Sequence, residues 1–512
     1  MTQNPSAQPI LPAESVAIET HQGPNWLKWS LGCAGLGMLL FTGIITLFVI
    51  VMPIVFRSLL PQQQAEILKH APFMQSVMPT REYAADTLPT AQSVNSSAVA
   101  ALLNQATTVL IVPTVLNSPT PTSIPTITRT PLSSVLATLT PTSLLAASPT
   151  FSASPTAIAS PTTLVTATDL PTATDTPLPS SFHLTGIKRV PQGWNDCGPA
   201  NITQALSYYG WTGTQEDAIA VLKPNNEDRN VSPWEMVRFV NQHTGVKAIS
   251  RVSGDLTLIK HLLVAQFAVI METGYIVAGE GWAGHYLTVL GYDDVQHIIF
   301  GGDSNLGFGA DGLGQREDYS DIDTRWREFN RQYIVIYPHE REAVLAAILG
   351  ADADPTYNAN HALQTAQSEA KAMPDNQYAW FNIGSSLTML SQYQQAAIAF
   401  DQSRNVGSQL PYRMAWYQFT PYEAYYNAQR FDDVLSIVQA TLGTTQYVEE
   451  TWYWRGMVEA AKGQNDAAIK DFDAVIKFNP GFTAAAEEEA RVKVGTFIPP
   501  SAGGFGHTAP TS

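Results

Sequence analysis

One cysteine of this chain stands where its thiol could react. Cys197 follows the string Gln-Gly-Trp-Asn-Asp and lies directly ahead of residues 199–209, whose apolar positions recur at helical spacing. The unpaired N–H groups and the dipole of a helix N-terminus stabilise a thiolate. Because the thiolate is the reactive form of cysteine, this placement favours a nucleophile.

Three further residues could complete a catalytic set with this cysteine. His285 begins a predicted strand and Asp303 ends the next one. A hairpin that turns near Asp293 and Asp294 would bring Asp303 back beside His285. The set would then supply a nucleophile, a base and a group that orients the base. Gln192, a few positions before the cysteine, could donate its amide to a developing oxyanion.

Each of these residues also has an ordinary structural interpretation. A lone cysteine is usually a small buried hydrophobe, and a strand histidine can be a satisfied packing residue. Asp293 and Asp294 compete with Asp303 for the third role, although their position favours a turn. The acidic, glycine-rich loop 303–323 could suggest calcium, but it lacks EF-hand spacing and is expected to be a solvated hairpin loop. The remaining histidines of this region have no comparable setting: His243, His261 and His297.

Three motifs resemble the C39-like cysteine peptidases, which are papain-like in fold. They are PQGWNDCGPANITQALSYYG, GHYLTVLGYDD and FGGDS, and the resemblance covers about residues 182–338. One departure is Ser304, which follows the aspartate where the family often has proline. C39-like domains fused to transporters clip leader peptides after a double glycine. This chain contains no Walker A motif, so that role is not supported.

The resemblance implies a role for each residue of the set. Cys197 corresponds to the nucleophile, His285 to the general base, Asp303 to the residue that orients the histidine, and Gln192 to an oxyanion-hole donor. The implied reaction is hydrolysis of peptide bonds in a peptide or protein substrate, or a related acyl transfer or amide hydrolysis. We expect neither a cofactor nor a metal.

The sequence around Gln192, Cys197, His285 and Asp303 predicts helices first and strands after them, and these elements must position the four side chains. Ser232 and Glu235 form a capping box that begins one helix. The short β-rich runs FAVIMET, HYLTVLGYD, HIIFGGD and QYIVIYP come after the helices. Residues 182–345 therefore predict an α+β domain with an antiparallel sheet, and the resemblance implies that its fold is papain-like. The helices are expected at residues 199–209, 232–245 and 256–266.

Residues 346–495 contain a repeat typical of tetratricopeptide (TPR) units. Small residues would let paired helices approach, and an aromatic ring would fill the gap between them. An all-α TPR solenoid is predicted, and its surface could bind a protein or peptide partner, an inference from fold alone. Val434 fits the small-residue position of a middle unit, and Ala362 that of a degenerate earlier one. The W…G…A-x₃-F skeleton is matched by Trp380, Gly384, Ala396 and Phe400, and again by Trp452, Gly456, Ala468 and Phe472.

The composition excludes some functions and indicates an uncharged segment. With 28 Lys plus Arg against 44 Asp plus Glu, the net charge is −16, which argues against a nucleic-acid partner. Two cysteines exclude a disulfide scaffold and a cysteine-based zinc finger. Apolar content is ordinary at 45%, but charged content is only 14%, against about 25% in soluble domains.

Residues 29–56 contain no charge and exceed the roughly 20 apolar residues that cross a bilayer. The polar tail 1–28 is too long and too poor in Lys and Arg for a cleaved signal peptide, so we predict a retained single-pass transmembrane helix. Cys33 does not form a lipobox, because the apolar run follows it. Lys28 precedes the span, whereas Arg57 and Lys69 follow it, so the positive-inside rule does not orient the span.

A Ser/Thr/Pro-rich segment, residues 88–181, follows a juxtamembrane segment, residues 57–87. Its composition predicts a disordered, semi-rigid stalk. A stalk beside a span favours a cell-membrane protein whose C-terminal domains are extracytoplasmic. Residues 496–512 are expected to be a disordered tail. The leading hypothesis is a membrane-anchored cysteine peptidase with a TPR module; the alternative is a catalytically silent peptide-binding or scaffold protein that keeps both folds.

Overall fold

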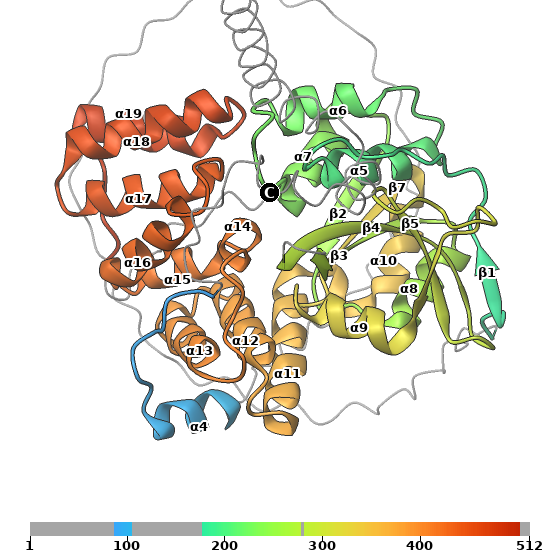
Figure 1. Ribbon diagram of the computed structural model, residues 1–512, viewed down its shortest axis with the longest axis horizontal. Coiled ribbons are helices and arrows are strands. Elements are labelled where there is room, and N and C mark those ends of the chain that lie inside the picture. Colours follow the sequence, from blue (N-terminus) through green and yellow to red (C-terminus); the bar gives the residue numbers. More distant parts are fainter. Residues whose placement is uncertain (1–86, 105–176, 278–280, 502–512) are drawn as a thin grey trace, which may run out of the picture. The chain divides into compact units, whose positions relative to one another are not determined.

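The computed structural model describes residues 87–104, 177–277 and 281–501, and all of these except Pro177 belong to one compact unit (Figure 1). The predicted span 29–56, the tail 1–28 and most of the predicted stalk lie outside these residues. Within the described ranges, no helix is long and apolar enough to cross a bilayer.

A seven-stranded antiparallel sheet forms the centre of residues 181–337. The strand order is β2-β7-β3-β4-β5-β6, and β1 also pairs with β4. The strands are β1 (Ser181–His183), β2 (Lys247–Arg251), β3 (Ala268–Val277), β4 (Gly281–Asp293), β5 (Ile298–Asp303), β6 (Gln315–Asp318) and β7 (Tyr333–Tyr337).

Helices cover both faces of this sheet. Alternate residues of β3 point to opposite faces, so Ile270 packs with one group of helices and Met271 with the other. The first group is α5 (Cys197–Ser207), α6 (Gln215–Leu222) and α7 (Pro233–His243); the second is α8 (Leu256–Val264), α9 (Tyr319–Arg327) and α10 (Glu342–Leu349). The structure confirms the mixed α/β class with an antiparallel sheet.

The predicted capping box is present. The prediction that residues 303–323 form one loop is wrong in part. Ser232 and Glu235 cap α7 reciprocally. The loop region instead contains β6 and the first turn of α9. That helix forms because Ile322 and Trp326, one turn apart, are both fully buried under the sheet. Its many charged residues concealed this short apolar stripe.

Residues 355–494, which we call the helical repeats after the pattern in their sequence, are all-α, as predicted. Their helices are α11 (Pro355–Ala372), α12 (Gln377–Met389), α13 (Tyr393–Asn405), α14 (Met414–Tyr417), α15 (Thr420–Asn427), α16 (Phe431–Leu442), α17 (Glu449–Ala461), α18 (Asn465–Phe478) and α19 (Thr483–Val494). Figure 1 shows α12 beside α13 and α17 beside α18. A Cβ at Gly384 would lie 2.7 Å from the Phe400 ring, and one at Gly456 would lie 2.9 Å from the Phe472 ring. The glycines therefore permit the close approach that the repeat pattern required.

Gly384→Ala is expected to destabilise the helical repeats by about 1–3 kcal/mol. The new methyl group has no room against Phe400, and this cost exceeds the helix propensity of alanine, a gain of about 1 kcal/mol. The urea midpoint measures the change. Gly245→Ala is the control, because a Cβ there meets nothing within 4 Å. Equal midpoints for the two variants would contradict the packing argument.

Residues 87–104 correct the predicted stalk, which was placed from Leu88 onward. Leu88 and Leu102 are buried in the core of the helical repeats. Helix α4 (Ser96–Asn104) lies against α11 and α13. Gln367 Nε2 donates to the Leu102 carbonyl at 2.8 Å, and Arg404 Nε donates to the Pro89 carbonyl at 2.8 Å. Averaging composition over the whole segment hid this short proline-free, apolar helix, so any stalk begins after it.

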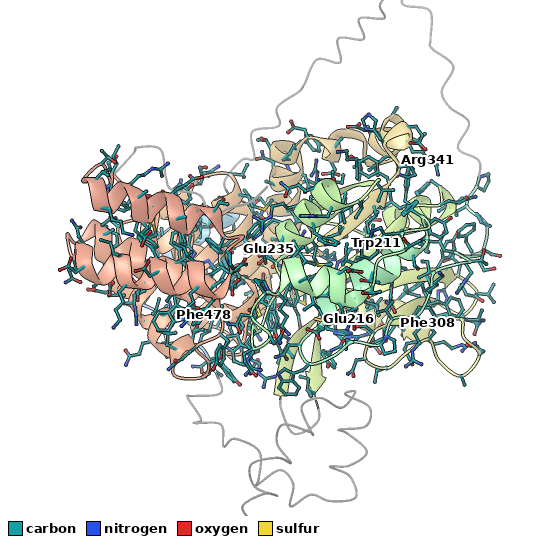
Figure 2. The ribbon with its side chains drawn as sticks, turned by 90° about the horizontal axis from the view of Figure 1, so that it is seen from above. Trp211, Glu216, Glu235, Phe308, Arg341 and Phe478 are labelled. Atoms are coloured by element: carbon teal, nitrogen blue, oxygen red, sulfur yellow. The ribbon has the colours of Figure 1, made fainter. Side chains whose placement is uncertain are left out.

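The helical repeats contact the sheet domain through buried polar groups. Asn382 Nδ2 on α12 donates to the Arg327 carbonyl at 2.8 Å. Asn479, the residue that follows α18, donates from Nδ2 to Glu235 Oε1 of α7 at 3.1 Å and to Glu449 Oε1 of α17 at 2.8 Å. Glu235, labelled in Figure 2, belongs to a cluster of four buried carboxyl groups that we call the interface carboxyls. Its members are Asp228, Glu235, Glu449 and Glu450.

Candidate active site

Cys197 is the first residue of α5, where the sequence places it. It is a free, half-buried thiol. The loop ahead of it is fixed by the buried Lys223 at the end of α6, whose Nζ donates to the Trp194 carbonyl at 2.6 Å and to Asp196 Oδ1 at 2.7 Å. The helix start therefore holds the thiol at a defined position.

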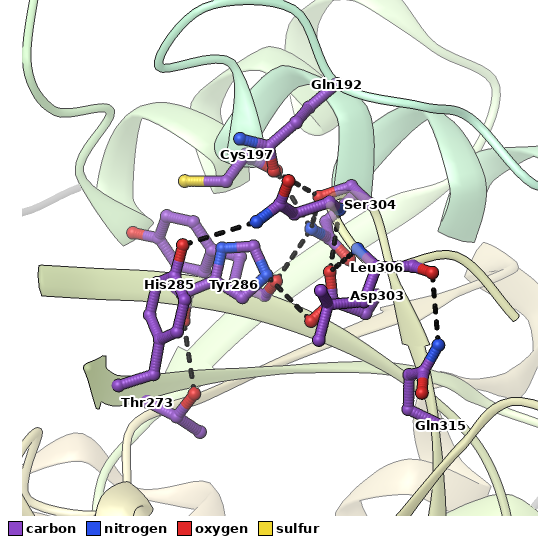
Figure 3. A network of polar contacts seen from close by, with 12 residues as sticks. Gln192, Cys197, Thr273, His285, Tyr286, Asp303, Ser304, Leu306 and Gln315 are labelled. Carbon is purple, nitrogen blue, oxygen red and sulfur yellow. Dashed lines mark hydrogen bonds and ion pairs between the residues drawn. The ribbon is translucent and has the colours of Figure 1, made fainter. Parts of the chain in front are cut away.

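His285 and Asp303 come together through the β4–β5 hairpin. Leu287 pairs with Asp303 in the sheet, so His285 lies diagonally opposite Asp303. His285 Nε2 is 3.3 Å from Asp303 Oδ2, and both side chains are buried (Figure 3). The two competing aspartates lie at the turn: Asp293 Oδ1 accepts from two turn amides, and Asp294 pairs with Lys260.

The charges of this pair stabilise each other. Burial raises the pKa of Asp303, but the His285 charge and the amides of Asn305 and Leu306 outweigh burial and lower it. Burial lowers the pKa of His285, but Asp303 and a hydrogen bond with Cys197 outweigh burial and raise it well above the usual value. At 3.3 Å the imidazole N–H is poorly aligned with the carboxylate, since His285 Nε2 lacks a partner of good hydrogen-bond geometry. We therefore treat the attraction as mainly coulombic.

Asp303→Asn is expected to lower the pKa of the His285 imidazole by at least about one unit, because the variant removes the facing negative charge. NMR titration of ring signals measures it, with the signal assigned by its loss in His285→Ala. Asp293→Asn, at the hairpin turn, is the matched control. An unchanged titration in Asp303→Asn would show that the carboxylate does not act on His285.

Gln192 is held by a hydrogen-bond network that sequence reasoning missed. Ser304 Oγ donates to Gln192 Oε1 at 2.7 Å, and Asn201 Nδ2 on α5 donates to Ser304 Oγ at 3.0 Å. The Gln192 backbone N–H donates to the Ser304 carbonyl at 3.0 Å. Because the amide oxygen is occupied, the Nε2 group remains available beside Cys197 (Figure 3). Ser304 was noted only for replacing a proline; here it orients the amide.

Two residues of β3 also border the site without having been predicted. The Tyr275 ring centroid is 5.1 Å from that of His285. Glu272 is buried near Cys197, and its pKa is raised well above the usual value by burial and by the cysteine's charge. Strand alternation could have indicated Tyr275, because it shares a face with Thr273, the cross-strand partner of His285. Nothing in the local sequence indicated Glu272.

In the ranges that the structure describes, no group of three or more His, Cys, Asp or Glu side chains could hold a metal ion. The arrangement of Cys197, His285, Asp303 and Gln192 contains instead a thiol, an imidazole that favours its charged form, a carboxylate and an amide donor. Such a set can form and release an acyl thioester.

Comparisons with known proteins add one solved structure. No protein-family model matches the chain, and no curated protein matches it. The chain is similar to a crystal structure described as a C39-like peptidase from Bacillus anthracis. The two share 14% sequence identity, the match covers 30% of this chain and 96% of that one, and the TM-score is 0.25. A likeness at this TM-score assigns neither fold nor activity, so we interpret the site from its own geometry.

Proposed function

We propose that the chain is a cysteine peptidase with a C39-like, papain-like domain, which hydrolyses peptide bonds outside the cell. The observation that carries the proposal is the placement of Cys197 at the N-terminus of α5, beside the buried His285–Asp303 pair. Four residues of complementary chemistry from separate parts of the domain meet there. A domain with a purely structural role has no need of this arrangement.

The proposed reaction runs through an acyl-enzyme. The Cys197 thiolate attacks the carbonyl carbon of the peptide, a C–S bond forms, and the carbonyl oxygen becomes an oxyanion. The Gln192 amide, with unpaired N–H groups of the first helical turn, stabilises that charge. The His285 imidazolium gives its proton to the leaving amine as the C–N bond breaks. Water, deprotonated by His285, then attacks the thioester carbonyl carbon. The C–S bond breaks, the acyl fragment leaves as a carboxylic acid, and the Cys197 thiolate and His285 imidazolium are restored.

We propose the remaining features on sequence grounds, together with the helix packing described above. The helical pairs with their Gly384–Phe400 and Gly456–Phe472 contacts support TPR units. Residues 29–56 would anchor the protein in the membrane by one helix, with the folded domains outside. A protein partner would bind the helical repeats at a surface other than the one that Asn382 and Asn479 present to the sheet domain.

Profiling a peptide library tests the proposed activity. Wild-type protein is expected to release fragments that Cys197→Ala does not, and the shared cleavage positions define the specificity. Cys33→Ala is the matched control, because it replaces the only other cysteine of the chain. If wild type and Cys197→Ala both bind peptides and neither cleaves them, the silent peptide-binding alternative replaces the enzyme.

A further inference from the structure

The strand that carries His285 begins inside the core of the helical repeats. Trp282 on β4 and Phe329 after α9 are buried in the same hydrophobic cluster as Trp380 and Phe400. The rings of Trp282 and Phe329 stack, with centroids 5.7 Å apart and an angle of 11° between their planes. The start of β4 is therefore fixed by two domains, and its position depends on the repeats as well as on the sheet.

Tyr417, the last residue of α14, reaches the position next to His285. The Tyr417 hydroxyl lies close enough to the Gly284 backbone N–H for that group to lower the pKa of the phenol. A Cβ at Gly284 would lie 3.0 Å from Tyr417 Cγ and 2.8 Å from Phe329 Cζ, so the two rings occupy the space where a side chain would project. Negative charge at Cys197 and Tyr275 raises the pKa of Tyr417 further after burial has raised it, as expected for a residue close to the site.

Two more contacts hold α14 to the sheet domain on either side of Tyr417. Arg413 Nη1 donates to the Trp282 carbonyl at 3.5 Å, and Gln418 Nε2 donates to the Glu328 carbonyl at 3.0 Å. Trp282 Nε1 in turn donates to Glu328 Oε2 at 2.6 Å. These bonds connect α14 with the start of β4 and with the end of α9.

We propose that Tyr417 is a positioning residue for His285, so that the helical repeats set the geometry of the active site. The inference rests on the proposed function for its consequence in catalysis. The His285 imidazole must reach Asp303 on one side and Cys197 on the other, so it tolerates little displacement. A 1 Å misplacement can lower a rate by about a hundredfold, so loss of the contact between the Tyr417 hydroxyl and Gly284 is expected to cost about tenfold.

The test compares Tyr417→Phe with Tyr422→Phe in the full chain. Tyr422 is also a buried tyrosine of the repeats, and its hydroxyl lies 3.0 Å from Thr441 Oγ1, away from β4. Tyr417→Phe is expected to lower kcat for peptide cleavage about tenfold, with KM changed less than about twofold. It should also lower the pKa of the His285 imidazole, which NMR titration measures. The groups that face this imidazole are Asp303, Cys197 and Tyr275. Tyr422→Phe should change neither.

A second variant, Gln418→Ala, distinguishes the positioning role of Tyr417 from the proposed peptidase activity. Gln418→Ala loosens α14 without altering Tyr417 and is expected to shift kcat and the His285 titration less, in the same direction. If Tyr417→Phe and Tyr422→Phe give the same kcat and the same titration, the positioning role is wrong. If wild type cleaves no peptide, the proposed function is wrong, and the His285 titration in Tyr417→Phe still decides whether Tyr417 positions the ring.

Discussion

His285→Ala is expected to lower kcat/KM for peptide cleavage on the order of 10⁴-fold, because in the proposed mechanism this imidazole exchanges protons with both the leaving amine and the attacking water. The same variant should slow alkylation of Cys197 by iodoacetamide at pH 7 to the rate of an ordinary thiol. The imidazolium that stabilises the thiolate would be absent. Mass spectrometry reads the modification of Cys197 separately from that of Cys33.

The matched control is His261→Ala, at an exposed position of α8. Its Nδ1 contacts only the Thr257 carbonyl of the same helix, at 2.8 Å, so the site should be unaffected. Equal alkylation rates in wild type, His285→Ala and His261→Ala would exclude a functional thiol–imidazole pair. The proposed mechanism would then lose its nucleophile.

Stability is expected to fall by roughly 3–5 kcal/mol as the pH rises from about 5 to about 8, because of the interface carboxyls. Burial and then the charge of Glu449 raise the pKa of Glu235 to about 8. Burial likewise raises the pKa values of Asp228 and Glu450 well above the usual range. In this window the folded protein binds more protons than the unfolded chain, which ionises near pH 4.5. The contribution of these carboxyl groups to stability is therefore greatest below that pH and is lost toward pH 8.

Glu235→Gln tests this directly, because the amide imitates the protonated carboxyl group. The variant is expected to reduce the decline of the urea midpoint between pH 5 and pH 8, and to be the more stable protein at pH 8. Glu487→Gln is the control, because that side chain is 63% exposed and lies on α19, outside the interface carboxyls. A wild-type midpoint that rises with pH, or an identical decline in Glu235→Gln, would contradict the prediction.

The core of the candidate site could be predicted because its signals are local. A cysteine before a helix, a histidine at a strand and an aspartate at the end of the next strand follow from short-range periodicity and one hairpin. Cys197, His285 and Asp303 therefore lie together as the spacing indicated. The packing glycines of the repeats are local in the same sense, since Gly384 and Phe400 occupy the two helices of one pair.

The residues that support this core could not be predicted, because they act across long separations in the chain. Ser304 reaches Gln192, and Tyr417 reaches Gly284, only after the strands and both domains have assembled. No periodicity records such contacts. The segment around α4 was missed for a different reason: a composition averaged over 88–181 outweighed the few apolar residues, such as Leu102, that bury against the repeats.

The docking of residues 87–104 determines how the folded part of the protein would carry a mechanical load. The first described segment ends at Asn104, on the helical repeats, and the next one is held to the sheet at Pro179, whose carbonyl accepts from Tyr292 Oη at 2.7 Å. A pull from the N-terminal side would therefore act first on Leu88, Leu102 and the repeats, not on the sheet that carries the candidate site. A single protease cut between 105 and 176 would leave two fragments that stay associated through the contacts of α4. The geometry of the candidate site would then be unaffected by such a pull and by such a cut.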